Sequence, residues 1–338
     1  MVDTRQNFYI GNLNGVLSSA GNFTYAISNV VDKYPIRAEA VQRSNPSATL
    51  LDPKHWVGLS STTAVQRAGL LAQLPVRYQQ QTSMCVAEVM AEELQLLDIF
   101  YNTPLGGSGE YSVPYIYAKG HQIAANYTEG MQPQWALEAA RMYGDCPQTM
   151  DPICSASENV SQAIASVTPA MDQEAAKHKI TAYGPVQVNG TVGQSAAALA
   201  EAIDHFPIMV SVPVANGGML FSPVPDGKGG YVAQWQPGSQ VSGGHELLAW
   251  DHRLYVAYAG ARPEFQIRCR NSWGAGYGQG GDVWLGASYL LWEAWSVTRA
   301  PVNPLCASLS SFLTQYGKNM PQDQIDALKQ YMTEKGCA

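Results

Sequence analysis

The sequence predicts an α+β fold of two lobes, in which a helical lobe is followed by a lobe of strands. Apolar residues recur at helical spacing through much of the segment from 62 to 143. After residue 180, short runs rich in Val and aromatic residues take over, and such runs are typical of strands. A chain of 338 residues can hold one large domain or two medium ones.

The helices are predicted from apolar periodicity and from residues that start or stop a helix. The clearest helix spans 85–101, where apolar residues from Val86 to Leu97 follow a period near 3.6 and glutamates occupy the opposite side. Pro75 ends the preceding helix, and Gly144 ends the helix that starts at Pro133. The helices expected in this half are 62–74, 85–101, 113–123 and 133–143.

The second half is predicted to alternate strands with one Ala-rich helix at 194–206. Strands are expected at 186–192, 208–214, 231–235, 246–250, 254–259, 265–270 and 281–285. Residues 1–50 indicate short strands and turns, and residues 309–314 and 323–332 indicate short helices. We therefore divide the chain into an N-terminal extension (1–51), a helical lobe (52–180), a β lobe (181–300) and a C-terminal helical extension (301–338).

Charge and hydropathy exclude several classes of function. The net charge is −7 and only 14% of residues are charged, so no basic patch indicates binding to nucleic acid or to an anionic membrane. The N-terminus lacks a signal-peptide pattern, and no apolar run reaches the length of about 20 residues that a membrane span needs. We expect a cytoplasmic or virion-associated protein.

The six cysteines form no CxxC pair and no cluster with zinc-ligand spacing, so neither a metal nor a cofactor is expected. Two pairs are closest in sequence and are candidates for disulfides, although the chain shows no secretion signal that would favour an oxidising compartment. These pairs are Cys146 with Cys154 and Cys306 with Cys337.

Cys85 is the candidate nucleophile because it opens the clearest helix. The positive end of the helix dipole favours a thiolate, which is the reactive form of cysteine. The alternative is a small buried residue at a helix start, and a lone cysteine would favour that alternative.

His245 and Asn271 are the candidate partners of that thiol. His245 follows Gly243 and Gly244 and precedes an apolar strand, which suits a general base at the edge of a cleft. Asn271 begins the turn Asn-Ser-Trp-Gly, where it can fix the orientation of an imidazole while Trp273 shields the bond from water. The alternatives are a core histidine and an ordinary polar turn.

Gln79 precedes Cys85 by six residues and offers a side-chain amide. Together with the backbone N–H of Cys85, it would supply two donors to the oxyanion of a tetrahedral intermediate. Because Gln80 and Gln81 follow directly, the alternative is that the three glutamines form an ordinary polar loop.

With these motifs in this order, the chain resembles the papain-like (family C1) cysteine peptidases, especially their divergent bacterial and viral branch. The likeness covers roughly residues 52–300, through the segment from Pro75 to Cys85, the cleft wall and helix at 130–144 and the turn at Asn271. It implies a helical lobe and an antiparallel, β-barrel-like lobe, with N- and C-terminal extensions.

The resemblance also implies roles for single residues. Cys85 would be the nucleophile, His245 the base, Asn271 the orienting residue and Gln79 the oxyanion donor. Gly130 and Met131 would pair with an extended substrate through their backbone. The remaining substrate-binding set is Pro133 and Pro213, which would make an apolar subsite, Gly244, Trp273 over the triad, and Tyr277 on the leaving-group side.

Several positions depart from the family pattern. Val86 stands where Trp is usual, and Thr82 stands where many relatives have a disulfide cysteine. Met131 and Tyr277 replace a common Gly and a common Trp. Glu246 replaces a usual Ala directly after the histidine and so brings a carboxylate near the base.

The function expected from these residues is hydrolysis of peptide or protein substrates through a thioester intermediate. One alternative is a structural or binding component of a larger assembly, such as a virion, which docks through its terminal extensions and has little activity. Another is an acyl-transfer enzyme that uses the same triad, such as an amidase or a transglutaminase.

Overall fold

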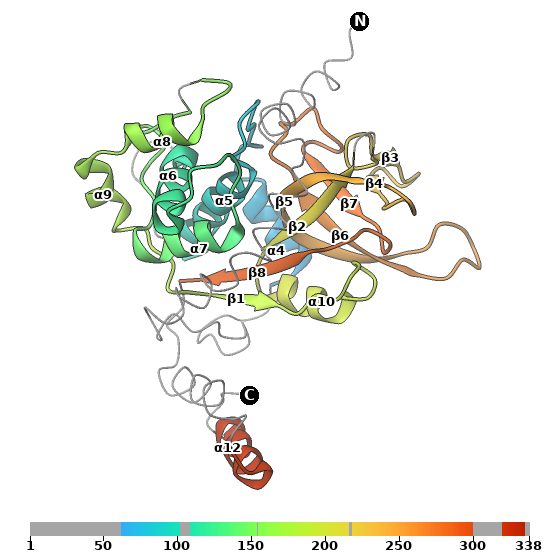
Figure 1. The fold of residues 1–338 in the computed structure, drawn as a ribbon. Helices are drawn as coiled ribbons and strands as arrows, with labels where there is room; N and C mark the ends of the chain where they lie inside the picture. The colour runs from blue at the N-terminus through green and yellow to red at the C-terminus, as the bar shows by residue number, and fades with distance from the viewer. Residues whose placement is uncertain (1–61, 102–108, 154, 216–217, 300–319, 335–338) are drawn as a thin grey trace, which may run out of the picture.

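The computed structural model describes residues 62–101, 109–153, 155–215, 218–299 and 320–334, and within them the protein has an α+β fold. In Figure 1, α5 to α9 gather on one side and most of the strands on the other. The helices are α4 (Ala64–Leu71), α5 (Cys85–Phe100), α6 (Val113–Ala124), α7 (Pro133–Met142), α8 (Val160–Ser166), α9 (Pro169–Ala175), α10 (Ala196–His205) and α12 (Gln322–Glu334). The strands are β1 (Ala182–Val186), β2 (Ile208–Ala215), β3 (Val224–Pro225), β4 (Tyr231–Ala233), β5 (Val241–Tyr255), β6 (Glu264–Arg270), β7 (Asp282–Leu285) and β8 (Glu293–Thr298).

The predicted helices that fall on described residues are confirmed within a few positions. The helix predicted at 62–74 is shorter, because α4 begins after its cap at Thr63 and ends at Leu71, before Pro75. Helices α8 and α9 were missed, since each has only seven residues and too few apolar positions to show a period. The predictions for residues 1–51 and 309–314 concern segments outside the described residues.

The eight strands form one sheet in the order β1-β8-β2-β5-β6-β7-β4-β3. The predicted antiparallel pairing is confirmed for all neighbours except β4 and β7, which pair in parallel at one edge. The predicted strand at 186–192 was wrong, because β1 ends at Val186 and most of that segment is loop.

The long strand β5 replaces two shorter predicted strands, 246–250 and 254–259. It pairs with β2 through its first half and with β6 through its second half, so one continuous strand serves two partners. His245 lies in the first half, and β6 ends at Arg270, directly before Asn271. This pairing brings the two candidate residues to the same end of the sheet.

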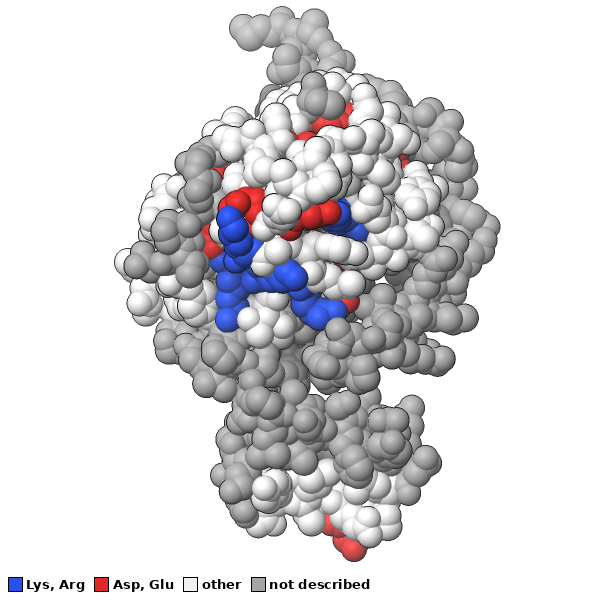
Figure 2. Space-filling model, turned by 90° about the vertical axis from the view of Figure 1, so that its left-hand side faces the viewer, with Lys and Arg blue, Asp and Glu red and all other residues white. Residues whose placement is uncertain are grey.

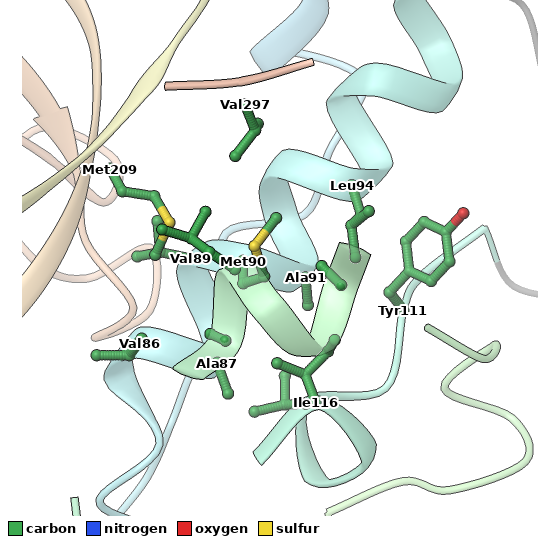
Figure 3. Packing of buried hydrophobic residues seen from close by; sticks show 14 of the residues in the cluster. Val86, Ala87, Val89, Met90, Ala91, Leu94, Tyr111, Ile116, Met209 and Val297 are labelled. Atoms are coloured by element: carbon green, nitrogen blue, oxygen red, sulfur yellow. The ribbon is translucent and has the colours of Figure 1, made fainter. Parts of the chain in front are cut away.

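Within the described residues, two large hydrophobic cores and a small one around Cys146 and Met171 hold the structure together. In β2, Val210 and Val212 face the core between the sheet and α10, whereas Met209 faces the core around α5, as expected for the alternation of side chains along a strand. Figure 3 shows the second core, where residues of α5 contact Ile116 of α6 and lie close to Met209 and Val297. Helix α5 is therefore packed on both the other helices and the sheet.

The side of the molecule that carries α8 and α9 is seen in Figure 2, where basic and acidic side chains gather together on a mostly uncharged surface. Two carboxylates of α9 form ion pairs here: Asp172 with Lys119 of α6 and Glu174 with Lys177 just after α9, each at 2.6 Å. In the described part of the chain, no helix has both the length and the apolar character needed to cross a membrane.

Three cysteines within the described residues, Cys85, Cys146 and Cys269, are free thiols. Cys146 is buried as a free thiol, and Cys154, the partner suggested for it, lies outside the described residues. The other suggested pair, Cys306 with Cys337, lies outside the described residues.

Candidate active site

Cys85 is the first residue of α5 and is half-buried. The preceding Met84 makes no side-chain hydrogen bond to the first turn, so no capping group occupies the N–H groups at this helix end. The backbone N–H groups of Val86 and of Glu246 lie against the sulfur and favour its ionised form. The thiol therefore sits between the start of α5 and the strand that carries His245.

His245 and Asn271 are joined directly. Nε2 of His245 lies 2.7 Å from Oδ1 of Asn271, and both side chains are buried. An amide oxygen can only accept, so Nε2 carries a hydrogen and Nδ1 is the ring nitrogen left free to take a proton. The amide thus sets the tautomer that a general base requires.

Trp273 covers this pair. Its ring stacks on the His245 ring at a centroid distance of 4.7 Å, and Phe221 stacks on Trp273 at 5.4 Å. Tyr277 meets Trp273 edge-on and donates its hydroxyl to the Leu220 carbonyl at 2.6 Å. Phe221 could not be predicted as part of the site, because the loop that carries it shows no motif.

Cys85 and His245 are brought close but are not hydrogen-bonded to each other in the described structure. The sulfur contacts the backbone of Glu246, the residue after the histidine. Burial raises the pKa of the Cys85 thiol to about 12 and lowers the pKa of His245 to about 4. The resting site thus favours a neutral thiol and a neutral imidazole.

Gln79 is buried, and its amide is held at both ends. Nε2 donates to the Thr82 carbonyl at 3.1 Å, and Oε1 accepts from the Ser272 hydroxyl at 2.5 Å. Thr82 in turn donates its hydroxyl to the Gln79 carbonyl at 2.7 Å. These bonds fasten the turn before Cys85 where relatives were expected to carry a disulfide cysteine.

Main-chain hydrogen bonds tie the segment before Cys85 to the turn after β6. The N–H of Gln79 donates to the Ser272 carbonyl and the N–H of Gly274 donates to the Arg77 carbonyl, both at 2.9 Å. Tyr78 and Trp273 form an antiparallel bridge between them. The backbone itself therefore brings the segment that leads to the thiol beside Asn271.

The predicted substrate-pairing segment is fixed by a residue that the sequence analysis missed. The Tyr117 hydroxyl accepts from the Gly130 N–H at 2.9 Å and donates to Glu129 at 3.2 Å. Gly130 has φ +89°, a left-handed conformation that favours glycine. Met131 packs against the core around α5, with its methyl group over Gly120.

The remaining predicted binding residues come from both lobes. Pro133 is buried at the start of α7, and Pro213 is buried in β2 directly opposite Gly244 of β5. Next to Pro133, the side chain of Gln134 donates a hydrogen bond to the carboxyl group of Glu293 at 2.6 Å. The binding roles of these residues stay predictions.

No group of three or more His, Cys, Asp or Glu residues in the described chain has the geometry of a metal site. What the site does contain is a thiol, an oriented imidazole and an amide. This set suits acyl transfer through a sulfur nucleophile.

Solved structures of cysteine proteases have a similar fold, and two of them serve as examples. Xylellain, a cysteine protease from Xylella fastidiosa, is 18% identical, with 75% of this chain and 91% of that chain covered and a TM-score of 0.54. The Amb a 11 cysteine protease, a major ragweed pollen allergen solved in its proform, is 14% identical, with 78% and 74% covered and a TM-score of 0.50. The fold is thus that of the papain-like cysteine proteases. No family model and no curated protein matches the chain.

Proposed function

We propose that the chain is a papain-like cysteine peptidase that hydrolyses peptide bonds through Cys85, His245 and Asn271. The observation that carries the proposal is the 2.7 Å bond between His245 and Asn271 beneath Trp273, at the place where α5 presents Cys85. The papain-like fold supports it. Membership of the divergent bacterial or viral branch stays a prediction.

In the proposed reaction, the Cys85 thiol transfers its proton to Nδ1 of His245 and the thiolate attacks the peptide carbonyl. The carbonyl oxygen becomes an oxyanion, which the Cys85 N–H and the Gln79 amide stabilise. The imidazolium then protonates the departing amine as the C–N bond breaks, and a thioester remains. Water, deprotonated by His245, hydrolyses the thioester and restores the thiol.

A second function, a structural or binding component with little activity, has one observation in its favour. Burial disfavours ionisation of both Cys85 and His245, and no hydrogen bond joins them within the described structure. A site that stays neutral would react slowly with any acyl group.

Selective alkylation tests these two functions. The folded protein is treated near neutral pH with substoichiometric iodoacetamide, and the modified cysteine is mapped by mass spectrometry. An activated thiolate predicts fast modification at Cys85, lost in His245→Ala. The matched control is His252→Ala, because His252 lies on the same strand and also bonds an oxygen, at 3.0 Å from Asp204.

Modification of Cys85 that is as slow as in denatured protein would overturn the peptidase proposal and favour the structural component. If Cys85 is activated, a peptide library with varied residues two positions before the scissile bond identifies a substrate. The predicted contribution of Pro133 and Pro213 makes apolar residues there the expected choice.

A further inference from the structure

The side chain of Glu246 lies buried beside the candidate nucleophile, and one of its two oxygens has no hydrogen-bond partner in the described structure. It is 1% exposed and follows His245 in β5. Its Oε2 accepts from the Ser211 hydroxyl at 2.6 Å, whereas Oε1 has no hydrogen-bond partner in the described structure. A buried oxygen without a donor is costly as part of a carboxylate.

Glu246 belongs to a polar row that crosses three strands. Ser211 of β2 is paired in register with Glu246 of β5 on one side and with Glu293 of β8 on the other. Residues paired in this way point to the same face, and Met209 and Leu248 place that face toward α5. Two carboxyl groups therefore flank one hydroxyl at the contact between sheet and helices.

Helix α5 adds a third carboxyl group to this contact. Glu93 is fully buried, and neither of its oxygens has a hydrogen-bond partner in the described residues. Electrostatic repulsion couples Glu93 to Glu246 and to Glu92, and couples Glu246 to Glu293. Burial raises the pKa of both Glu93 and Glu246 well above the ordinary value.

The groups that face Glu246 offer no positive charge to balance an ionised carboxylate. They are Cys85 and Glu93 of α5, Ser211 of β2 and Glu293 of β8, with neutral His245 beside it in β5. Within the described chain, no Lys or Arg forms an ion pair with Glu246 or Glu93. By contrast, Glu88 and Glu92 of the same helix are paired with Arg77 and Arg270.

Glu246 acts on the Cys85 sulfur in two opposite ways. Its backbone N–H lies against the sulfur and favours the thiolate. Its side chain, once ionised, repels the thiolate and favours the thiol. While the carboxyl group is neutral, this repulsion is absent and only the N–H of Glu246 acts on the sulfur.

We propose that Glu246 is a positioning residue that keeps its proton while Cys85 ionises, so that the thiolate forms only while the buried Glu246 and Glu93 carboxyl groups are neutral. The inference rests on the proposed peptidase function, because it concerns the same thiol. As pH rises, Glu246 loses its proton, the thiolate is repelled and Cys85 becomes less reactive, although free thiols become more reactive.

The test measures the rate of Cys85 alkylation by iodoacetamide against pH in the full chain, site by site, between about pH 5 and 10. Glu246→Gln removes the ionisation and keeps the shape. We expect it to react about tenfold faster than wild type on the alkaline side, where wild type declines. Glu201→Gln, an exposed change in α10, is the matched control and keeps the wild-type profile.

Two further variants keep the test decisive if Glu246→Gln does not fold. Ser211→Ala removes a donor that favours the carboxylate, so the alkaline decline moves to higher pH. Glu293→Gln removes the negative charge that opposes ionisation of Glu246, so Glu246 ionises more readily and the decline moves to lower pH. A merely structural role does not produce shifts of opposite sign.

Failure of the inference is distinguishable from failure of the proposed function. If Cys85 is selectively reactive but its pH profile is the same in wild type, Glu246→Gln and Ser211→Ala, the inference is overturned and the peptidase proposal stands. If Cys85 of wild type reacts no faster than a denatured thiol at every pH, both are overturned.

Discussion

The Ser272 hydroxyl donates a hydrogen bond to Oε1 of Gln79 at 2.5 Å. The bond connects the turn that carries Asn271 to the side chain proposed as an oxyanion donor, across 193 positions of sequence. Because Oε1 is the accepting end, Nε2 keeps a second N–H beyond the one it gives to Thr82. Ser272 therefore orients the donor that Gln79 can offer to a substrate.

Removal of this donor is expected to slow turnover. Gln79→Ala should lower kcat by roughly 10²–10³, the usual cost of losing one oxyanion donor. Ser272→Ala leaves the amide in place but frees its orientation, and we expect a loss of about tenfold. Both are measured as kcat and KM on a peptide found in the library, with Ser166→Ala as a remote control. An unchanged kcat in Gln79→Ala would remove Gln79 from the proposed oxyanion hole.

Trp273→Ala is expected to raise the pKa of His245. Burial holds that pKa at about 4, so exposure of the ring to water should move it toward the ordinary 6.5. NMR titration of the histidine ring protons measures the shift. Phe265→Ala is the matched control, because Phe265 stacks on His252 of the same strand at 5.7 Å. A His245 pKa that stays near 4 in Trp273→Ala would show that other groups exclude the water.

Tyr117→Phe is expected to raise KM with little change in kcat, because the hydroxyl holds Gly130 in the predicted substrate-pairing segment. Loss of a hydrogen bond of this kind costs about 0.5–1.5 kcal/mol, or roughly two- to tenfold in KM. Tyr183→Phe is the control, since that hydroxyl bonds Glu138. A fall in kcat at constant KM would instead place Tyr117 with the reacting groups.

Stability is expected to fall as pH rises through neutrality. Burial raises the pKa of Glu88 and Glu92 from 4.5 to about 7, despite the opposing charges of Arg77 and Arg270. The folded state thus binds protons that the unfolded state releases. This contribution is full below 4.5 and is lost as pH passes about 7.

Thermal unfolding at a series of pH values measures this effect. The double variant Glu88→Gln/Glu92→Gln should show a flatter dependence of Tm on pH than wild type. If Tm falls with rising pH as steeply in the double variant as in wild type, the pH dependence arises from other groups, including Glu93 and Glu246.

Gly144→Ala is expected to destabilise the protein by more than about 1 kcal/mol. Gly144 follows α7 with φ +79°, and an added Cβ would lie 1.9 Å from the Ala175 carbonyl oxygen. Gly69→Ala is the matched contrast, because Gly69 lies within α4 with no atom within 4 Å of the new Cβ. We expect Gly69→Ala to raise the free energy of unfolding by about 0.5–1 kcal/mol. Urea unfolding of both variants measures the two effects. Equal midpoints would contradict the steric argument.

The parts of the fold that could be predicted from the sequence are those whose signal is local. The period of α5 follows from its own residues, and the turn that starts at Asn271 carries its own motif. The same holds for Gln79, whose distance from Cys85 along the chain is part of the pattern.

The features that were missed arise from packing between distant segments. Nothing in the sequence of α6 distinguishes Tyr117 from other core residues. Its hydroxyl accepts a hydrogen bond from the Gly130 N–H only because α6 packs against the segment before α7. Phe221 and the strand β3 lie in a stretch without alternation. The sequence pattern places Glu93 on a polar, solvent-facing side of the helix. In the structure the sheet covers α5 on that side, so Glu93 is buried.

The main-chain bonds that join Arg77 and Gln79 to the turn at Ser272 and Gly274 affect which sequence changes the site tolerates. Bonds of this kind depend on no side chain, so an exchange at Tyr78 leaves them in place. A single inserted or deleted residue shifts the alignment by one and separates Gln79 from Ser272. Variants of this chain must therefore keep the number of residues from 77 to 79 and from 272 to 274, even where they change the residues themselves.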